Sequence, residues 1–252
     1  MPTRVFTVSE RARVREHLLA KAQSDPRIIA GAAIGSDAQG SSDRWSDLDL
    51  TFGVADSPAL TGVLEDWTRD LVSGFDAVHL FDVSDRTTVY RVFLLPGNLQ
   101  VDVSFTPGFV AEYGSRFQLL FGTAVKRDYA TPISARDLFG IGVHHAVRAR
   151  YCIERDRRWQ AEYWISGVRA QALSLACRRH GLEASHGRGF DRLPRDVLDA
   201  ASAGLVRSLE RNELLRALTS SIELLIQQAG EVRGLAERLS TQLRDLESAD
   251  WP

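Results

Sequence analysis

Hydrophobic and polar positions follow two different patterns along this chain, and the change between them divides it. In the first part, short continuous apolar runs such as 28–34 and 48–54 are separated by polar turns, which is typical of buried strands. From Ser134 onward, apolar residues recur every three or four positions, which predicts helices. We therefore predict an α+β fold, in which residues 1–131 form a mixed β-sheet flanked by helices and residues 132–252 form an all-α helical bundle.

Local signals predict the elements around these runs. Residues 7–24 and 59–73 carry apolar side chains at helical spacing, so two helices are expected to pack on the N-terminal sheet. A Pro-Gly-Asn turn at 96–98 lies between two strand-like segments, which predicts an antiparallel hairpin. Residues 117–129 are expected to form a helix or turn that leads to a last edge strand. A Ser-x-x-Asp capping signature at 134–137 begins the first of about five C-terminal helices.

Three aspartates are the candidate metal ligands. Asp47 and Asp49 stand at the start of the apolar run 48–54, and in a strand both carboxylates lie on one face. Two neighbouring carboxylates repel each other, so such a pair persists in bulk water or around a cation, and carboxylates are ligands that Mg²⁺ prefers. Asp102 interrupts the alternating segment 99–105 at a polar position, which makes it the candidate for the third carboxylate.

A glycine-serine turn precedes these acids. Gly35 and Ser36 end the apolar run 28–34, and a glycine allows backbone N–H groups to approach a ligand closely, as in loops that bind phosphate. The residues between this turn and Asp47 are polar and predict a loop beside a nucleotide. The phosphate loop and the metal ligands are therefore expected to belong to one site.

The Gly35-Ser36 turn, the Asp47-x-Asp49 pair and the later Asp102 together resemble the signature of the polymerase-β-like nucleotidyltransferase superfamily. Within it, the two-domain layout is most similar to the antibiotic nucleotidyltransferases that modify aminoglycosides and lincosamides. The resemblance implies that the three aspartates hold two Mg²⁺ ions and that ATP is the donor. It also implies that AMP is transferred to a hydroxyl of a small molecule, with release of pyrophosphate, and that the role is antibiotic resistance.

The helical part supplies further candidates. Within the arginine-rich segment 148–158, Arg148 and Arg155 lie one heptad apart and are expected to bind triphosphate oxygens; a solvated arginine-rich surface is the alternative. Glu162 lies on a polar stripe of the next helix, and the alternative there is a solvated face with an intrahelical ion pair. In the antibiotic nucleotidyltransferases, the C-terminal domain closes over the nucleotide and an acid from it can act as general base. By this resemblance in role, Glu162 is the candidate base, with Asp102 as the other.

Charge and hydropathy limit the possible partners. The formal net charge of −2 gives no basic field for nucleic acid, which argues against a template-using polymerase. No apolar run approaches the roughly 18 residues of a membrane span, and the N-terminus lacks a signal-peptide apolar segment, so we expect no membrane partner and a cytoplasmic location. Cys152 and Cys177 are expected to be buried free thiols. Both a monomer and a homodimer are compatible with the sequence.

Two other functions are compatible with the motif. One is a nucleotide-binding regulatory or antitoxin-like protein that keeps the fold with little turnover, and the intact set of three aspartates disfavours it. The other is an RNA-end nucleotidyltransferase, which requires a strong, salt-dependent affinity for RNA, and the charge balance disfavours it. The sequence identifies neither the acceptor nor the nucleotide base.

Overall fold

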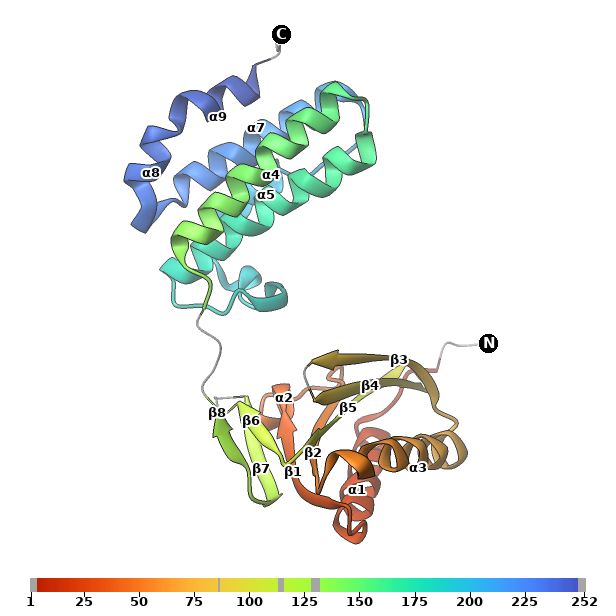
Figure 1. Cartoon of the computed structure of the whole chain (residues 1–252). Coiled ribbons are helices and arrows are strands. Elements are labelled where there is room, and N and C mark those ends of the chain that lie inside the picture. Colours follow the sequence, from red (N-terminus) through yellow and green to blue (C-terminus); the bar gives the residue numbers. More distant parts are fainter. Residues whose placement is uncertain (1–3, 86, 113–115, 128–131, 249–252) are drawn as a thin grey trace. The chain divides into compact units, whose positions relative to one another are not determined.

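The computed structural model describes the chain except for residues 1–3, 86, 113–115, 128–131 and 249–252 (Figure 1). The chain forms two compact units, Met1–Ala130 and Thr131–Pro252. The described residues of the first unit combine a mixed sheet with helices, and those of the second unit form helices. The predicted α+β fold class is thus confirmed.

A six-stranded sheet with the order β3-β4-β5-β2-β1-β7 forms the centre of the first unit. β2 (Leu48–Val54) and β5 (Leu99–Pro107) are parallel, whereas the other neighbouring strands of this sheet are antiparallel. The remaining strands of the sheet are β1 (Ile28–Ile34), β3 (Val78–Asp85), β4 (Thr88–Leu95) and β7 (Phe117–Gly122). Two short strands, β6 (Val110–Glu112) and β8 (Val125–Arg127), form a separate parallel pair.

Two expectations for this sheet had different outcomes. The hairpin around 96–98 is confirmed, because β4 and β5 are antiparallel and Gly97 and Asn98 both adopt the positive φ that a tight turn uses. The helix or turn expected to begin at residue 117 is wrong, because Phe117–Gly122 is a strand that pairs with β1. This pairing joins segments far apart in the chain, and short apolar segments leave helix and strand ambiguous.

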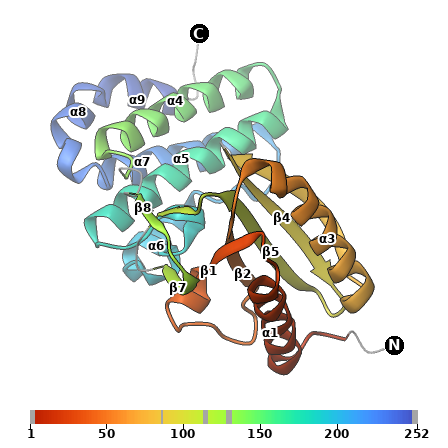
Figure 2. The ribbon, with the colours of Figure 1, turned by 60° about the horizontal axis from the view of Figure 1, so that its bottom comes forward.

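Helices α1 (Val8–Ser24) and α3 (Ser57–Phe75) cover one face of the sheet (Figure 2). Alternate residues of β2 and β5 point toward these helices and are fully or almost fully buried, namely Leu48, Leu50, Phe52, Val101, Val103 and Phe105. Trp67 of α3 packs against Phe52 and Phe105, with ring centroids 4.8 and 5.1 Å apart. The intervening positions, Asp49 and Asp102 among them, point to the opposite face, which we call the open face.

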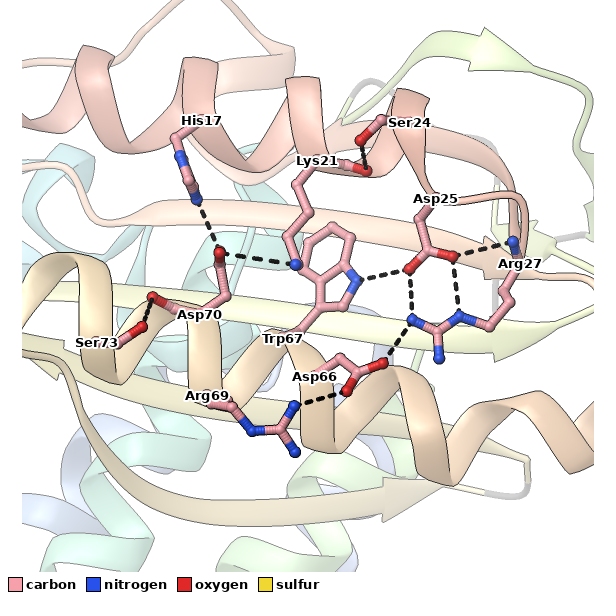
Figure 3. Close-up of polar contacts among 10 residues, drawn as sticks. All are labelled: His17, Lys21, Ser24, Asp25, Arg27, Asp66, Trp67, Arg69, Asp70 and Ser73. Atoms are coloured by element: carbon pink, nitrogen blue, oxygen red, sulfur yellow. Dashed lines mark hydrogen bonds and ion pairs between the residues drawn. The ribbon is translucent and has the colours of Figure 1, made fainter.

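A polar network fixes α1 and the start of β1 against α3 (Figure 3). Asp25, which ends α1, accepts hydrogen bonds from the backbone N–H of Arg27 at 3.0 Å and from its guanidinium Nε and Nη2 at 2.9 and 2.8 Å. The Trp67 indole donates to the same carboxylate at 3.4 Å, and Arg27 also pairs with Asp66 at 2.9 Å. The Arg27 guanidinium holds the pKa of Asp25 below its ordinary value, so the carboxylate stays charged at neutral pH.

The second unit is built around two long helices, α4 (Ala135–Glu154) and α5 (Arg158–Arg179). They pack with α7 (Arg211–Gln227) in one apolar core, to which the shorter helices α6 (Arg195–Ala203), α8 (Arg233–Arg238) and α9 (Ser240–Glu247) add. Ser134 caps α4 by accepting a hydrogen bond from the Asp137 N–H at 3.1 Å, as the sequence signature predicts.

Cys152 and Cys177 are buried free thiols, which confirms the expectation for them. None of the helices described has the length and apolar character needed to span a bilayer.

Arg150 has a structural role in this unit. Its side chain is fully buried, and Nη1 donates to the backbone oxygens of Leu246 and Ser248 at 2.9 and 2.6 Å. Glu154 pairs with Nε at 2.7 Å. These contacts hold α9 and the residue after it against α4. Within the segment 148–158, Arg150 therefore stabilises the fold of the helical unit.

The Asp25 network makes a testable contribution to stability. Asp25→Asn loses the charged partner of Arg27, and we expect it to lower the free energy of unfolding by about 1–3 kcal/mol at pH 7. Because the folded pKa of Asp25 is lowered, this stabilisation is present above the ordinary aspartate pKa and disappears as the pH falls through the folded value. Urea unfolding at several pH values measures it. Asp66→Asn, at the more exposed end of the network, is the control and should cost less; an equal loss would contradict the central role of Asp25.

Candidate active site

The parallel pairing of β2 and β5 brings the three aspartates together. Asp49 lies directly opposite Asp102 in the strand register, and Asp47 stands two positions before Asp49. One carboxylate oxygen from each of the three lies within 4.8 Å of the other two. All three side chains are half-buried. This group of hard oxygen ligands, open on the side away from the helices, fits a divalent cation.

The proximity of the acids is electrostatically unfavourable without a cation. Burial, followed by the charges of Asp47 and Asp102, raises the pKa of Asp49 to about 7, against a smaller opposing effect of Arg116. Burial also raises the pKa of Asp102, although the Gln100 amide donates to its oxygens at 3.0 and 3.2 Å. A bound proton or a bound cation relieves this repulsion, and only the cation does so while all three groups remain carboxylates.

The glycine-serine turn lies directly beside the acids. Residues Gly35–Ala38 form one helical turn, α2, and Gly35 adopts a φ of +67°. A Cβ at Gly35 would lie 2.5 Å from Oδ2 of Asp49, so a larger residue would collide with the carboxylate. The N–H of Gly35 donates to the carbonyl of Arg116 at 3.1 Å, which ties the turn to the residue that precedes β7. Glycine is therefore required here both for its backbone angle and for space.

Helix α1 positions the loop that ends at Asp47. The Arg11 guanidinium Nη1 donates to the carbonyls of Asp43 and Ser46 at 2.9 and 3.0 Å. The Ser46 hydroxyl in turn accepts from the N–H of Asp43 at 2.9 Å. This loop was expected from its composition, and its anchoring to α1 fixes where the chain enters β2.

Arg116 is the functional candidate that the sequence does not reveal. Its Nη2 lies 3.8 Å from the position of a Cβ on Gly35, on the same side as the Asp49 carboxylate, and its charge lowers the pKa of Asp49. No motif surrounds Arg116; the pairing of β7 with β1 brings it to the site. A signal for that pairing is absent from local spacing, so sequence analysis alone does not find this residue.

The remaining candidates belong to the second unit. Glu162 on α5 accepts a hydrogen bond from the Ser166 hydroxyl at 2.8 Å. Arg148 lies over the ring of Trp164, with Cζ 5.9 Å from the ring centroid, and Arg155 lies over Tyr151 at 5.7 Å. The geometry of the first unit does not bear on these three residues, and their roles at a nucleotide stay predictions.

Comparison with known proteins gives little beyond this geometry. Neither a family model nor a curated protein matches the chain. Among solved structures, an aminoglycoside 6-adenyltransferase from Bacillus subtilis is similar, with 13% sequence identity and a TM-score of 0.38 over 93% of this chain and 97% of that chain. The chemistry of the site is therefore argued from the residues of this chain.

The raised pKa of Asp49 predicts a pH-dependent cost to stability. Between about pH 4 and pH 7 the folded protein holds a proton at Asp49 that the unfolded chain releases, so the free energy of unfolding falls as the pH rises through this window. In Asp49→Asn this cost is absent. With divalent cations chelated, we expect the variant to be more stable than the parent at pH 8, by more than about 1 kcal/mol, and the difference to shrink toward pH 4.

Urea unfolding at both pH values measures this effect. Asp85→Asn, which changes an exposed aspartate of β3, is the control and should leave stability almost unchanged at either pH. A variant at Asp49 that is no more stable than the parent at pH 8 would show that the three carboxylates do not repel one another as the geometry requires.

Proposed function

We propose that this protein is a metal-dependent nucleotidyltransferase that moves a nucleoside monophosphate, with ATP as donor, to a hydroxyl of a small molecule. The observation that carries the proposal is the convergence of Asp47, Asp49 and Asp102 within 4.8 Å of one another on the open face of the sheet. Carboxylates together with substrate phosphate oxygens are the usual ligands of Mg²⁺ at phosphoryl-transfer sites. The glycine turn beside Asp49 supports it, since it leaves room at the acids.

The proposed reaction assigns a role to each aspartate. Two bound Mg²⁺ ions would supply charge neutralisation and would orient the attacking and leaving oxygens of an in-line displacement. Asp47 and Asp49 would hold the ion that binds the triphosphate, and all three aspartates would hold the ion at the acceptor hydroxyl. The acceptor hydroxyl attacks the α-phosphorus, the bond to the bridging oxygen breaks, and pyrophosphate leaves. Asp102, whose pKa is raised by burial, is one candidate for taking the hydroxyl proton.

Positive and polar groups beside the acids suit the triphosphate. Gly35 and Ser36 are proposed to bind the terminal phosphates; because the Gly35 N–H already donates to a carbonyl, the Ser36 hydroxyl is the group of this turn assigned to them. Arg116 adds a guanidinium close to Asp49, where it offsets negative charge as pyrophosphate departs. A triphosphate carries more negative charge than two Mg²⁺ ions neutralise at every stage, so such a group is chemically useful.

We keep four narrower proposals, two for residues of the second unit and two for the enzyme as a whole. Arg148 and Arg155 bind phosphate oxygens, and Glu162 is the second candidate for the general base. The acceptor is an antibiotic of the aminoglycoside or lincosamide type, and the enzyme acts in the cytoplasm. The roles of Glu162 and of the antibiotic depend on the family resemblance. Those of Arg148 and Arg155 depend on their heptad spacing in an arginine-rich segment, and the location depends on hydropathy.

The central experiment is Asp49→Asn. Pyrophosphate release from ATP and Mg²⁺ is measured over a panel of small hydroxyl compounds, and the variant is expected to lose roughly a hundredfold or more of the activity because a metal ligand is gone. Asp85→Asn serves as the control of equal charge change, and circular dichroism establishes that each variant is folded. Full activity in Asp49→Asn removes the metal-site assignment, and a parent that binds ATP without turnover over the panel would favour a regulatory protein.

The role of Glu162 is tested separately. If Glu162 removes the hydroxyl proton, Glu162→Gln should lower kcat by roughly a hundredfold and abolish the acidic limb of the pH–rate profile. Ser166→Ala removes the hydrogen bond that Ser166 donates to Glu162 and is the control for a purely structural effect. A Glu162→Gln rate equal to that of the parent eliminates Glu162 as the base and leaves Asp102.

A further inference from the structure

The sheet face that carries the aspartates extends onto β4 and β3, with the almost fully buried Val92 between Asp102 and Phe81. The strand register aligns Asp49 of β2 with Asp102 of β5, Asp102 with Val92 of β4, and Val92 with Phe81 of β3. Residues directly opposite each other on neighbouring strands have their side chains on the same face. One row of side chains therefore runs from the proposed metal ligands to the edge of the sheet.

The outer part of this face is apolar and exposed. In the next row, Ser104 is opposite Tyr90, and Tyr90 is opposite Val83. Phe81 and Val83 are each 52% exposed and Tyr90 is 42% exposed, and we call these three residues the apolar strip. Contiguous exposed apolar side chains mark binding surfaces more often than single ones do. Helices α1 and α3 pack on the other face of the sheet and leave these side chains exposed.

The charged side chains of Asp82 and Arg91, described beside the apolar strip, pair with each other. Val92, which lies between the strip and Asp102, is apolar and only 7% exposed. The hydroxyls of the neighbouring rows bond each other, with Ser104 donating to Thr51 at 2.8 Å. The side chain of Asp82 on β3 pairs instead with Arg91, which is anchored to the α3 carbonyl of Leu64 on the opposite face. Among these described residues the two charged side chains are already paired with each other, whereas Phe81 and Val83 present exposed apolar surface.

We propose that the apolar strip binds an apolar part of the acceptor and so selects amphiphilic hydroxyl compounds over purely polar ones. Of the two acceptor types proposed above, this favours the lincosamide type over the strongly polar aminoglycosides. The inference rests on the proposed function, because the aspartates define where the acceptor hydroxyl must lie. Neighbouring strands are about 4.8 Å apart, so Phe81, two strands from Asp102, lies about 10 Å away. One small molecule spans that distance with its hydroxyl at the aspartates and its apolar end on Phe81 and Val83.

Site-specific labelling tests the strip without relying on turnover. Both native cysteines are buried, so in Val83→Cys the introduced thiol is the accessible target for a maleimide. The probes are octyl and methyl β-glucoside, which share their hydroxyls and differ in the alkyl chain, with the octyl compound kept below its micelle concentration. Octyl glucoside at about twice its dissociation constant should slow labelling roughly threefold, and methyl glucoside should not.

Val72→Cys is the matched control, because Val72 of α3 is 45% exposed and lies on an element that covers the other face. Its labelling should be unaffected by either glucoside. Failure of octyl glucoside to protect Val83→Cys overturns the proposal. So does an unlabelled Val83→Cys protein that is a dimer by light scattering, since the strip would then be covered by a second copy through the edge strand β3.

Kinetics separate this proposal from the proposed function. In the pyrophosphate assay with both glucosides as acceptors, the preference for octyl over methyl glucoside is the ratio of their kcat/KM values. Phe81→Ser should reduce this ratio roughly tenfold, and Val72→Ser should leave it unchanged. Protection in the labelling experiment with no turnover over the whole panel of hydroxyl compounds contradicts the transferase and supports the strip. Turnover with equal kcat/KM for the two glucosides and no protection refutes the strip and leaves the transferase intact.

Discussion

The parallel pairing of β2 with β5 is the constraint on which the site depends. It places Asp49 opposite Asp102 at a half-buried position, where burial and neighbouring charge raise the pKa of Asp49 to about 7. No local interaction would hold these carboxylates together, because they repel. The apolar packing of the other face against α1 and α3 imposes the arrangement and offsets its cost.

The alternation of side chains along the two strands gives the sheet two chemically different faces. One face is buried by helices that the Asp25 and Arg27 network fastens together, and it specifies the register. A shift of one residue would turn Asp49 into the core, so stability and site geometry are set by the same pairing. The open face carries no such packing requirement at its acids, which frees it for ligand chemistry.

Sequence patterns were sufficient to predict that Asp49 and Asp102 lie on the face opposite the apolar core. A strand has a period of two, and in each strand the acid occupies a position between apolar residues that share the other face. These patterns were insufficient for Arg116, which reaches Asp49 only through the pairing of β7 with β1. Sequence patterns also could not show that Arg150 differs in role from the neighbouring arginines, although it is buried and donates to the carbonyl of Leu246 in α9. The spacing of residues along a helix shows which of them share one side of the helix. Which other element packs on that side depends on segments far away in the sequence. The roles of Glu162, Arg148 and Arg155 stay predictions for the same reason.

Edge strand β3 exposes apolar side chains, and the aspartate site alone does not explain why they are there. β3 is exposed along its whole length and displays Phe81 and Val83, although exposed apolar edge strands favour unwanted pairing between chains. A polar residue at either position would remove that hazard without disturbing the core, since neither side chain packs into it. Phe81 lies in the same row of the sheet as Asp102, and Val83 lies in the next row. In the proposed transferase both side chains would contact an acceptor whose hydroxyl is held at the aspartates. In this proposal the charged centre supplies the chemistry, and the apolar edge of the sheet determines which acceptor binds.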